Sequence, residues 1–505
     1  MIVNDPDEAF AQAVPWPIGG RRRRCRQKRV SPLSLGENAL SIFRSQNASR
    51  SIYVPMTGSA DQGKGGPILS GLYDQLLSRG VQYFLPSSHL AIVGRVPQPT
   101  REIVFHAASP TELRFDWLGI RYVLTNYREF TDHEQRMVRS IVKFLSTRYE
   151  LLFERETTAR NIPIFGGLIE DHYVSAFLEG RVFDDVRSAV TLPDRVSEAI
   201  EVLRISALSS YEDKRISTGA LLFGTLPDTC HQLPPRPLDA LLYSSELTSI
   251  RSFHRICDGL RTMALVDAIG YMVELIDVQE WARPLSDIEL PVPTARRYRT
   301  HCRATVCGGH ICLVLTPNGE IKIFGEGVQL FSFLDGRWHL TDAVSKYQAW
   351  EAAIGRKELA ARLFSSALNL AEHRRGGMFV VLDDPEYASK LVSELDLLET
   401  DRRDRASRKN QLHYLLRSTR ATELSTGVLE SIAQIDGSVV LDRDSKLVAF
   451  GAILRQSAPV DENEEIGEGG RTAAAISASR FGDVLMVSEG GQLSFYQKGH
   501  CIWTS

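Results

Sequence analysis

Long apolar runs are missing from the sequence. No stretch approaches about 18 consecutive apolar residues, the length that a membrane-spanning helix needs, although 43% of the 505 residues are hydrophobic. The opening MIVNDPDEAF has neither the basic start nor the apolar core of a secretory signal. These absences predict a soluble, cytoplasmic protein without a membrane partner.

Paired cysteines and an excess of one charge are also missing. Seven cysteines, an odd number spread thinly, argue against a disulfide framework. Their densest cluster, in THCRATVCGGHICL, lacks the CxxC pairs that place two thiolates on one zinc ion, so core packing is the preferred interpretation and zinc the alternative. The formal net charge of −3 gives no overall attraction to nucleic acid, which is therefore not expected as a partner.

Residues 1–66 carry a basic run, RRRRCRQKR, followed by Ser-rich and Gly-rich segments with little apolar periodicity. This composition predicts a flexible basic leader, in which a solvated charge run is preferred over contact with nucleic acid or acidic lipid. The leader ends in GSADQGKGG, which nearly matches a phosphate-binding P-loop. Gly65 stands where that loop needs a Ser or Thr hydroxyl for magnesium, so a linker is the preferred interpretation.

The segment 67–165 alternates between helical and strand patterns. Helices are predicted in SGLYDQLLSRG and TDHEQRMVRSIVKFLSTRY, and strands in HLAIVGRV, REIVFHA and IRYVLTN. Thr131 and Asp132, followed by Glu134, provide an N-terminal cap for the second helix. A small α/β region is predicted, without a motif that indicates its function.

The rest of the chain contains an internal repeat. SALSSYEDKRISTGALLFGTLPD parallels SALNLAEHRRGGMFVVLDDPE, each a helical pattern that breaks at Gly and enters an apolar strand. GLRTMALVDAIGYMVELID parallels GVLESIAQIDGSVVLDRDS, which pairs Asp267 with Asp436. RTHCRATVCGGHICLVLTPNGEIKIF parallels RTAAAISASRFGDVLMVSEGGQLSFY, which pairs Arg299 with Arg471. The stretches VSAFLEGRVF and LFSFLDGRWHL agree as connecting hairpins.

Three matched blocks in one order predict two tandem copies of one α/β domain, at 166–326 and 327–505. Each copy is expected to be a mixed β-sheet with flanking helices. Two copies in one chain also allow a face-to-face intrachain pseudo-dimer, and a homo-oligomer is the alternative.

Carboxylate, glycine and arginine positions in the second copy indicate a nucleotide site. Asp436, followed by Gly437 and the small Ser438 at the start of an apolar strand, suits a place where a metal-bound triphosphate approaches the backbone. In GEGGRTAAA the glycines expose backbone N–H groups before a helix start, and Arg471 adds a forked cation for phosphate oxygens. The alternatives are a turn at Asp436, a plain glycine loop, and pairing of Arg471 with a nearby glutamate.

At these residues the second copy resembles the diadenylate cyclase domain, the nucleotide-binding domain of the bacterial DNA-integrity scanning protein DisA and of related membrane-bound cyclases. The family pattern has a helix, Gly-Ala and a strand, then a distant Asp-Gly-Ala, then Gly-Thr-Arg-His-Arg with small residues after it, then a strand into Ser-Glu-Glu. The corresponding stretches here are GGMFVVL, DGS at 436–438, GEGGRTAAA at 467–475 and VSEGG at 487–491. The resemblance covers the second copy and, more weakly, the first.

The resemblance implies synthesis of cyclic di-AMP from two ATP molecules with Mg or Mn. By position, Asp436 would be the catalytic residue that holds the metal, and Arg471 would contact phosphate. The nucleotide-binding positions that carry over are Gly437, Ser438, Gly467, Gly469, Gly470, Thr472, Ser488 and Glu489.

The chain also departs from the family pattern at the phosphate side. Gly469, Gly470 and Arg471 stand in place of Arg-His-Arg, and Glu468 replaces the preceding Thr. Charge stabilisation often contributes several kcal/mol to phosphoryl transfer, so the loss of these groups is expected to weaken catalysis more than nucleotide binding.

The resulting hypothesis is a nucleotide-binding sensor or regulatory module for ATP or a cyclic dinucleotide. An active diadenylate cyclase and a purely structural or partner-binding protein are the two alternatives. The first copy keeps Asp267 and Arg299 but has TPNG in place of Ser-Glu, which favours a scaffold role.

Overall fold

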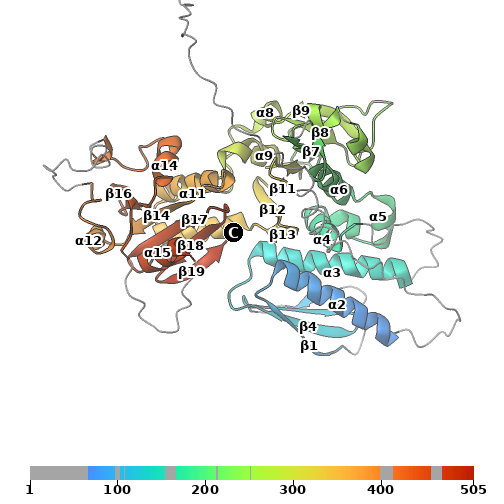
Figure 1. Cartoon of the computed structure of the whole chain (residues 1–505). Helices are drawn as coiled ribbons and strands as arrows, with labels where there is room; N and C mark the ends of the chain where they lie inside the picture. The colour runs from blue at the N-terminus through green and yellow to red at the C-terminus, as the bar shows by residue number, and fades with distance from the viewer. Residues whose placement is uncertain are drawn as a thin grey trace, which may run out of the picture. The chain divides into compact units, whose positions relative to one another are not determined.

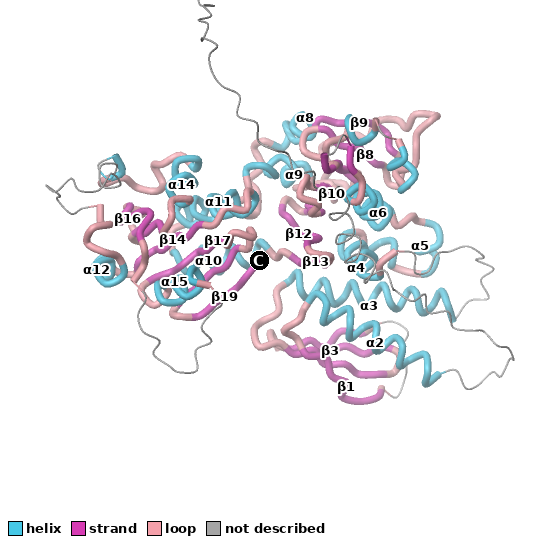
Figure 2. Tube along the Cα trace, viewed as in Figure 1, coloured by secondary structure: helices cyan, strands magenta, loops and turns pink. Residues whose placement is uncertain are grey.

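The structure, a computed structural model, describes residues 66–96, 103–106, 109–153, 167–211, 214–250, 252–398, 413, 415–455 and 469–505. The basic leader with its near-P-loop sequence, and Gly467, lie outside these residues. From Gly66 onward, helices flank three larger β-sheets, as Figures 1 and 2 show. The predicted mixed α/β class is confirmed. None of the described helices combines the length and hydrophobicity that crossing a bilayer requires.

The N-terminal α/β region is a four-stranded antiparallel sheet, ordered β1-β4-β3-β2, with two helices. The predicted cap of helix α3 is confirmed, because Glu134 N donates to Thr131 Oγ1 (3.2 Å) and Thr131 N donates to Glu134 Oε2 (3.1 Å). Strand β3 was not predicted. The elements are α2 (Gly66–Phe84), β1 (His89–Arg95), β2 (Val104–His106), β3 (Glu112–Trp117), β4 (Ile120–Thr125) and α3 (Asp132–Phe153).

The first large sheet is ordered β13-β12-β11-β10-β7-β8-β9, and only its β7–β8 pair is parallel. Alternate residues of β8, such as Ala264 and Leu265, enter separate core clusters on the two faces, which α6 covers on one side and α8 and α9 on the other. The elements are α6 (Arg195–Ala207), β7 (Thr218–Leu222), β8 (Thr262–Val266), β9 (Met272–Asp277), α8 (Val278–Ala282), α9 (Arg299–Ala304), β10 (Ile311–Leu315), β11 (Ile321–Gly325), β12 (Val328–Leu334) and β13 (Arg337–Leu340).

The second large sheet is ordered β16-β15-β14-β17-β18-β19, and only its β14–β15 pair is parallel. Phe379 and Val380 of β14 again enter separate clusters, under α11 and α14 on one face and α15 on the other. The elements are α11 (Lys357–Glu372), β14 (Gly377–Leu382), α14 (Thr426–Ala433), β15 (Ser438–Leu441), β16 (Leu447–Ala452), α15 (Gly470–Ala478), β17 (Gly482–Val487), β18 (Leu493–Gln497) and β19 (His500–Thr504).

The two large sheets share one connectivity. Six strands of each sheet match in spatial order and in relative direction: β12-β11-β10-β7-β8-β9 in the first sheet and β19-β18-β17-β14-β15-β16 in the second. Strand β13 is an additional edge strand of the first sheet. Helices α6 and α11 precede the first strand of each sheet, and α9 and α15 precede β10 and β17. This correspondence is what a duplication would produce, while the duplication itself stays a prediction.

The expected boundary between residues 326 and 327 falls between strands of the first sheet, because β12 pairs with β11, β13 pairs with β12, and neither belongs to the second sheet. The prediction that VSAFLEGRVF forms a hairpin is wrong. Its apolar residues Val174 and Phe177 lie three apart on one face of helix α4, whereas Asp335 and Gly336 both take positive φ and close the β12–β13 hairpin. The remaining elements are α4 (Ile169–Leu178), α5 (Val186–Thr191), β5 (Ser210–Tyr211), β6 (Lys214–Arg215), α7 (Phe253–Ile256), α10 (Ala343–Ile354) and α12 (Ala388–Leu391).

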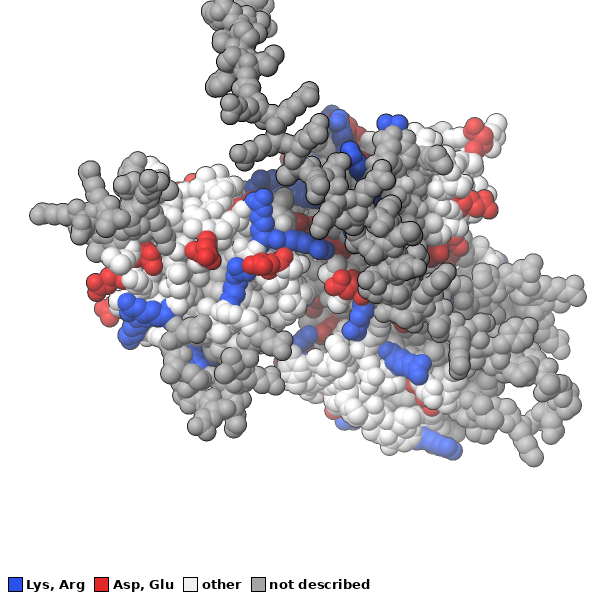
Figure 3. All heavy atoms as spheres, viewed as in Figure 1, with Lys and Arg blue, Asp and Glu red and all other residues white. Residues whose placement is uncertain are grey.

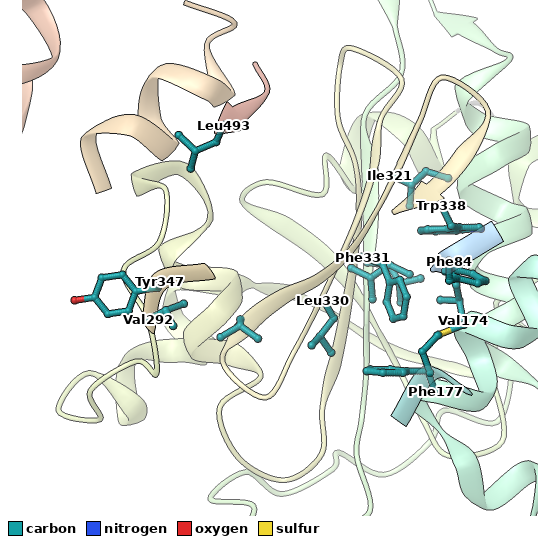
Figure 4. Packing of buried hydrophobic residues seen from close by; sticks show 14 of the residues in the cluster. Phe84, Val174, Phe177, Val292, Ile321, Leu330, Phe331, Trp338, Tyr347 and Leu493 are labelled. Carbon is teal, nitrogen blue, oxygen red and sulfur yellow. The ribbon is translucent and has the colours of Figure 1, made fainter. Parts of the chain in front are cut away.

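Trp338 joins the first sheet to the helices beside it. It lies on β13, is 1% exposed, and is one of the cluster residues shown in Figure 4 together with Phe84, Val174, Phe177 and Phe331. Its indole Nε1 donates a hydrogen bond of 2.7 Å to a carboxylate of helix α4. The indole ring of Trp338 is therefore packed in the core while its buried N–H group has a hydrogen-bond acceptor.

Candidate functional site

The second sheet positions the predicted site residues at one edge. Strands β14 and β15 are parallel and therefore begin at the same edge, while β17 is antiparallel to β14 and ends there. A pocket of about 580 Å³ opens at this edge. It is lined by Arg374, Arg375, Gly376, Gly377, Ala433, Gln434, Ile435, Asp436, Gly437, Arg471 and Glu489.

Asp436 presents an uncommitted carboxylate to this pocket. Its side chain is exposed and forms no hydrogen bond or ion pair with another described residue. The carboxylate therefore does not close a turn in the described part of the chain, which was the alternative interpretation. Magnesium is typically bound through one or two carboxylates together with substrate phosphates, and Asp436 with Glu489 fits that donor set.

Position 437 requires glycine for a structural reason. Its φ is +118°, and a Cβ built there would overlap the backbone of Gly451 on strand β16. The sequence predicted that a nucleotide would approach the backbone closely at Gly437, but strand β16 fills the space beside this glycine. This glycine shapes the floor of the pocket by letting β15 and β16 meet.

Arg471 lies across the pocket. Its guanidinium packs over Gly376, where a Cβ would overlap it, and Nη2 lies 3.6 Å from Glu489 Oε1. Glu489 is 83% exposed on its side chain, so this ion pair is weak and open to exchange with a ligand anion. The pairing that was the alternative for Arg471 is therefore present, in a form that leaves the guanidinium inside the pocket.

Two further arginines were missed by the sequence analysis. Arg374 takes a positive φ of +50° in the turn between α11 and β14, and Arg375 Nη1 donates to Gln434 Oε1. The signal was the sequence AEHRRGG, which was interpreted only as a helix that breaks at Gly. With Arg471, the pocket contains three guanidinium groups and two carboxylates.

Several predicted residues do not line this pocket. Ser438 is buried and its Oγ donates to Met378 Sδ (3.4 Å), Thr472 hydrogen-bonds Tyr496, and Ser488 Oγ accepts from Gln492 N (3.0 Å). These three hydroxyls stabilise strands and a hairpin turn. Gly469 and Gly470 start helix α15.

The pairing of Asp267 with Asp436 that the repeat predicted is wrong. Asp267 follows strand β8, whereas Asp436 precedes β15, so the two carboxylates belong to opposite strand ends. The structural equivalent is Asp442, since Asp267 Oδ1 accepts from Tyr271 N (2.9 Å) as Asp442 Oδ1 accepts from Lys446 N (2.8 Å).

The two histidines near the cysteine cluster, His301 and His310, form hydrogen bonds with backbone groups. Burial lowers the pKa of His301 and of His310 to about 4, so both are neutral at pH 7. His310 Nδ1 accepts from Gly224 N (2.9 Å), which leaves the proton on Nε2 beside Thr229 Oγ1 (3.1 Å). Among the described residues, no group of three His, Cys, Asp or Glu side chains is arranged to hold a metal ion.

Comparison with known proteins adds little. No family model matches the chain, and no curated protein does. Among solved structures, a hypothetical membrane spanning protein from Bacillus cereus shares 21% identity over 32% of this chain and 70% of its own, with a TM-score of 0.23. DacA from Staphylococcus aureus shares 16% identity over 30% of this chain and 87% of its own, with a TM-score of 0.19. At these TM-scores neither likeness supports a conclusion about fold or activity.

Proposed function

We propose that the second sheet binds an adenine nucleotide or a cyclic dinucleotide in the pocket at the start of β14 and β15, as a sensor or regulatory module. The observation that carries this proposal is the convergence of Arg374, Arg375 and Arg471 on a pocket that also holds the uncommitted carboxylate of Asp436. Guanidinium groups suit phosphate because their forked N–H donors match its oxygens. The volume of about 580 Å³ lies within the range of small-molecule sites.

In this proposal Mg or Mn arrives with the nucleotide and neutralises phosphate charge. Asp436 is the residue placed to hold that ion, and Arg471 is placed to exchange its weak pair with Glu489 for a phosphate oxygen. Basic and acidic side chains are interspersed on the described surface visible in Figure 3, and in this proposal the cations of the pocket itself attract the ligand.

Catalysis is expected to be weak or absent. None of the described residues that line the pocket is a histidine, and the Arg-His-Arg of the resembled family is replaced by Gly469, Gly470 and Arg471. Cyclisation of two ATP molecules also needs a second nucleotide site facing the first. Asp267 does not provide one, because it lies at the other strand end and pairs with Arg236 (Nε to Oδ2, 2.8 Å). An active cyclase, the alternative function, would therefore need a second copy of the chain.

Incubation of the purified chain with ATP and manganese or magnesium, followed by chromatography and mass spectrometry, tests this assignment. We expect ATP to be returned unchanged by the wild type and by the Asp436→Asn variant. Cyclic di-AMP formed by the wild type, and not by Asp436→Asn, would establish the cyclase alternative in place of the sensor.

A further inference from the structure

A second cavity, of about 420 Å³, lies beside helix α9 and is separate from the nucleotide pocket. Its wall on one side is the segment 288–303, and on the other side α10 and α11. Its charged lining residues are Glu289, Arg296, Arg299, Arg303, Glu351 and Lys357. Four cations therefore face two carboxylates.

Two of these cations have no ion-pair partner in the part of the chain that the structure describes. Arg299 and Arg303 lie four residues apart on α9 and therefore on one face of the helix. Neither forms an ion pair or side-chain hydrogen bond with another described residue, and Arg303 Nε is buried without an acceptor. A buried donor without an acceptor is unfavourable, and so are two like charges four residues apart on a helix unless an anion lies near them.

The other two cations are engaged differently. Arg296 Nη2 reaches Thr426 Oγ1 (3.0 Å) and Glu430 Oε1 (3.1 Å), and Lys357 Nζ lies 3.5 Å from Glu289. The Glu289 carboxylate is 84% exposed and pairs with Lys357. Neither Glu289 nor Glu351, the other carboxylate that lines the cavity, forms an ion pair with Arg299 or Arg303. Among the described residues, the two arginines of α9 therefore have no ion-pair partner in the cavity.

One side of the cavity is apolar. Val292 and Tyr347 are both buried members of the main core cluster and both line the cavity, and Figure 4 labels them. Pro291 and Pro293 extend this wall. A ligand with a charged end for α9 and a less polar body for this wall matches the lining.

We propose that this cavity binds a small phosphate-bearing molecule through the paired guanidinium groups of Arg299 and Arg303. A tetrahedral anion offers oxygens to the guanidinium groups of both Arg299 and Arg303 at once. The proposal does not depend on the nucleotide pocket, which uses different residues.

Calorimetric titration of the full chain with inorganic pyrophosphate, without added metal, tests the proposal. The titration is performed in the Arg471→Gln background, so that one of the phosphate contacts proposed for the other pocket is removed. We expect the double variant Arg299→Gln/Arg303→Gln to bind at least tenfold more weakly. The matched control is Arg297→Gln, a neighbouring arginine that does not line the cavity, and we expect its affinity to change less than twofold.

A second double variant, Arg299→Lys/Arg303→Lys, keeps the charge but removes the forked donors, and circular dichroism checks that it is folded. We expect it to bind several-fold more weakly than the parent chain. Binding unchanged in both double variants, or no saturable binding by the parent chain, would overturn the proposal. It would equally be overturned if Arg297→Gln lost as much affinity as the double variants.

Discussion

Replacement of Arg471 by glutamine lowers the affinity for ATP by tenfold to about a hundredfold. Hydrogen bonds to charged groups contribute about 1.5–3 kcal/mol, and each 1.4 kcal/mol is a factor of ten in affinity. Glutamine keeps a polar side chain but removes the charge and the fork that point over Gly376. Because Arg471 is partly exposed and its ion pair among the described residues is with an exposed glutamate, we expect the fold to tolerate the change.

Isothermal titration of the variant and the wild type with ATP and magnesium measures this effect. Arg356→Gln is the matched control, since Arg356 also pairs with an exposed carboxylate, that of Asp444, but does not line the pocket. Equal affinities for the wild type and Arg471→Gln would remove Arg471 from the nucleotide site.

Replacement of Trp338 by alanine lowers the free energy of unfolding by about 3–5 kcal/mol, the usual cost of truncating a fully buried large aromatic residue. Trp338 packs against Phe333 (ring centroids 5.1 Å apart) and donates from Nε1 to Asp171 Oδ1 (2.7 Å). Truncation leaves a cavity and removes one of the hydrogen bonds to a carboxylate that is 2% exposed.

Denaturant unfolding measures this prediction, with Trp338→Phe as the control. Phenylalanine retains most of the packing, and Arg204 Nη2 still donates to Asp171 Oδ1 (2.7 Å), so we expect a loss of about 1 kcal/mol. A loss below about 1 kcal/mol for Trp338→Ala would show that β13 does not anchor the first sheet to helix α4.

Local patterns predicted most elements of the fold. The Thr131–Glu134 capping box and the apolar strands of the second sheet needed only nearby residues, and these strands are buried as expected. VSAFLEGRVF and LFSFLDGRWHL fold differently despite similar residues. The first stretch packs one face of a helix on the core, whereas the second forms a hairpin that turns at Asp335. Long-range contacts, which the local pattern does not contain, decide between these two structures.

The site was predicted in part. Asp436 and Gly437 precede β15, and Glu489 follows β17, which is antiparallel to β14, so these residues reach the edge of the sheet where β14 and β15 begin. Arg471, on helix α15, lines the same pocket. Pairing Asp267 with Asp436 failed, since similar Asp-containing stretches occur at both strand ends and only the register separates them. The contribution of Arg374 and Arg375 depends on the turn before β14, which the residue pattern did not define.

Photo-crosslinking with an azido-adenine nucleotide, followed by peptide mapping, tests the central claim most directly. The account predicts labelled peptides around residues 374–377, 433–437 or 469–491, and loss of this label when unmodified ATP is added in excess. Label that ATP does not displace, or that falls only on peptides of the first sheet, would contradict a nucleotide site at the start of β14 and β15.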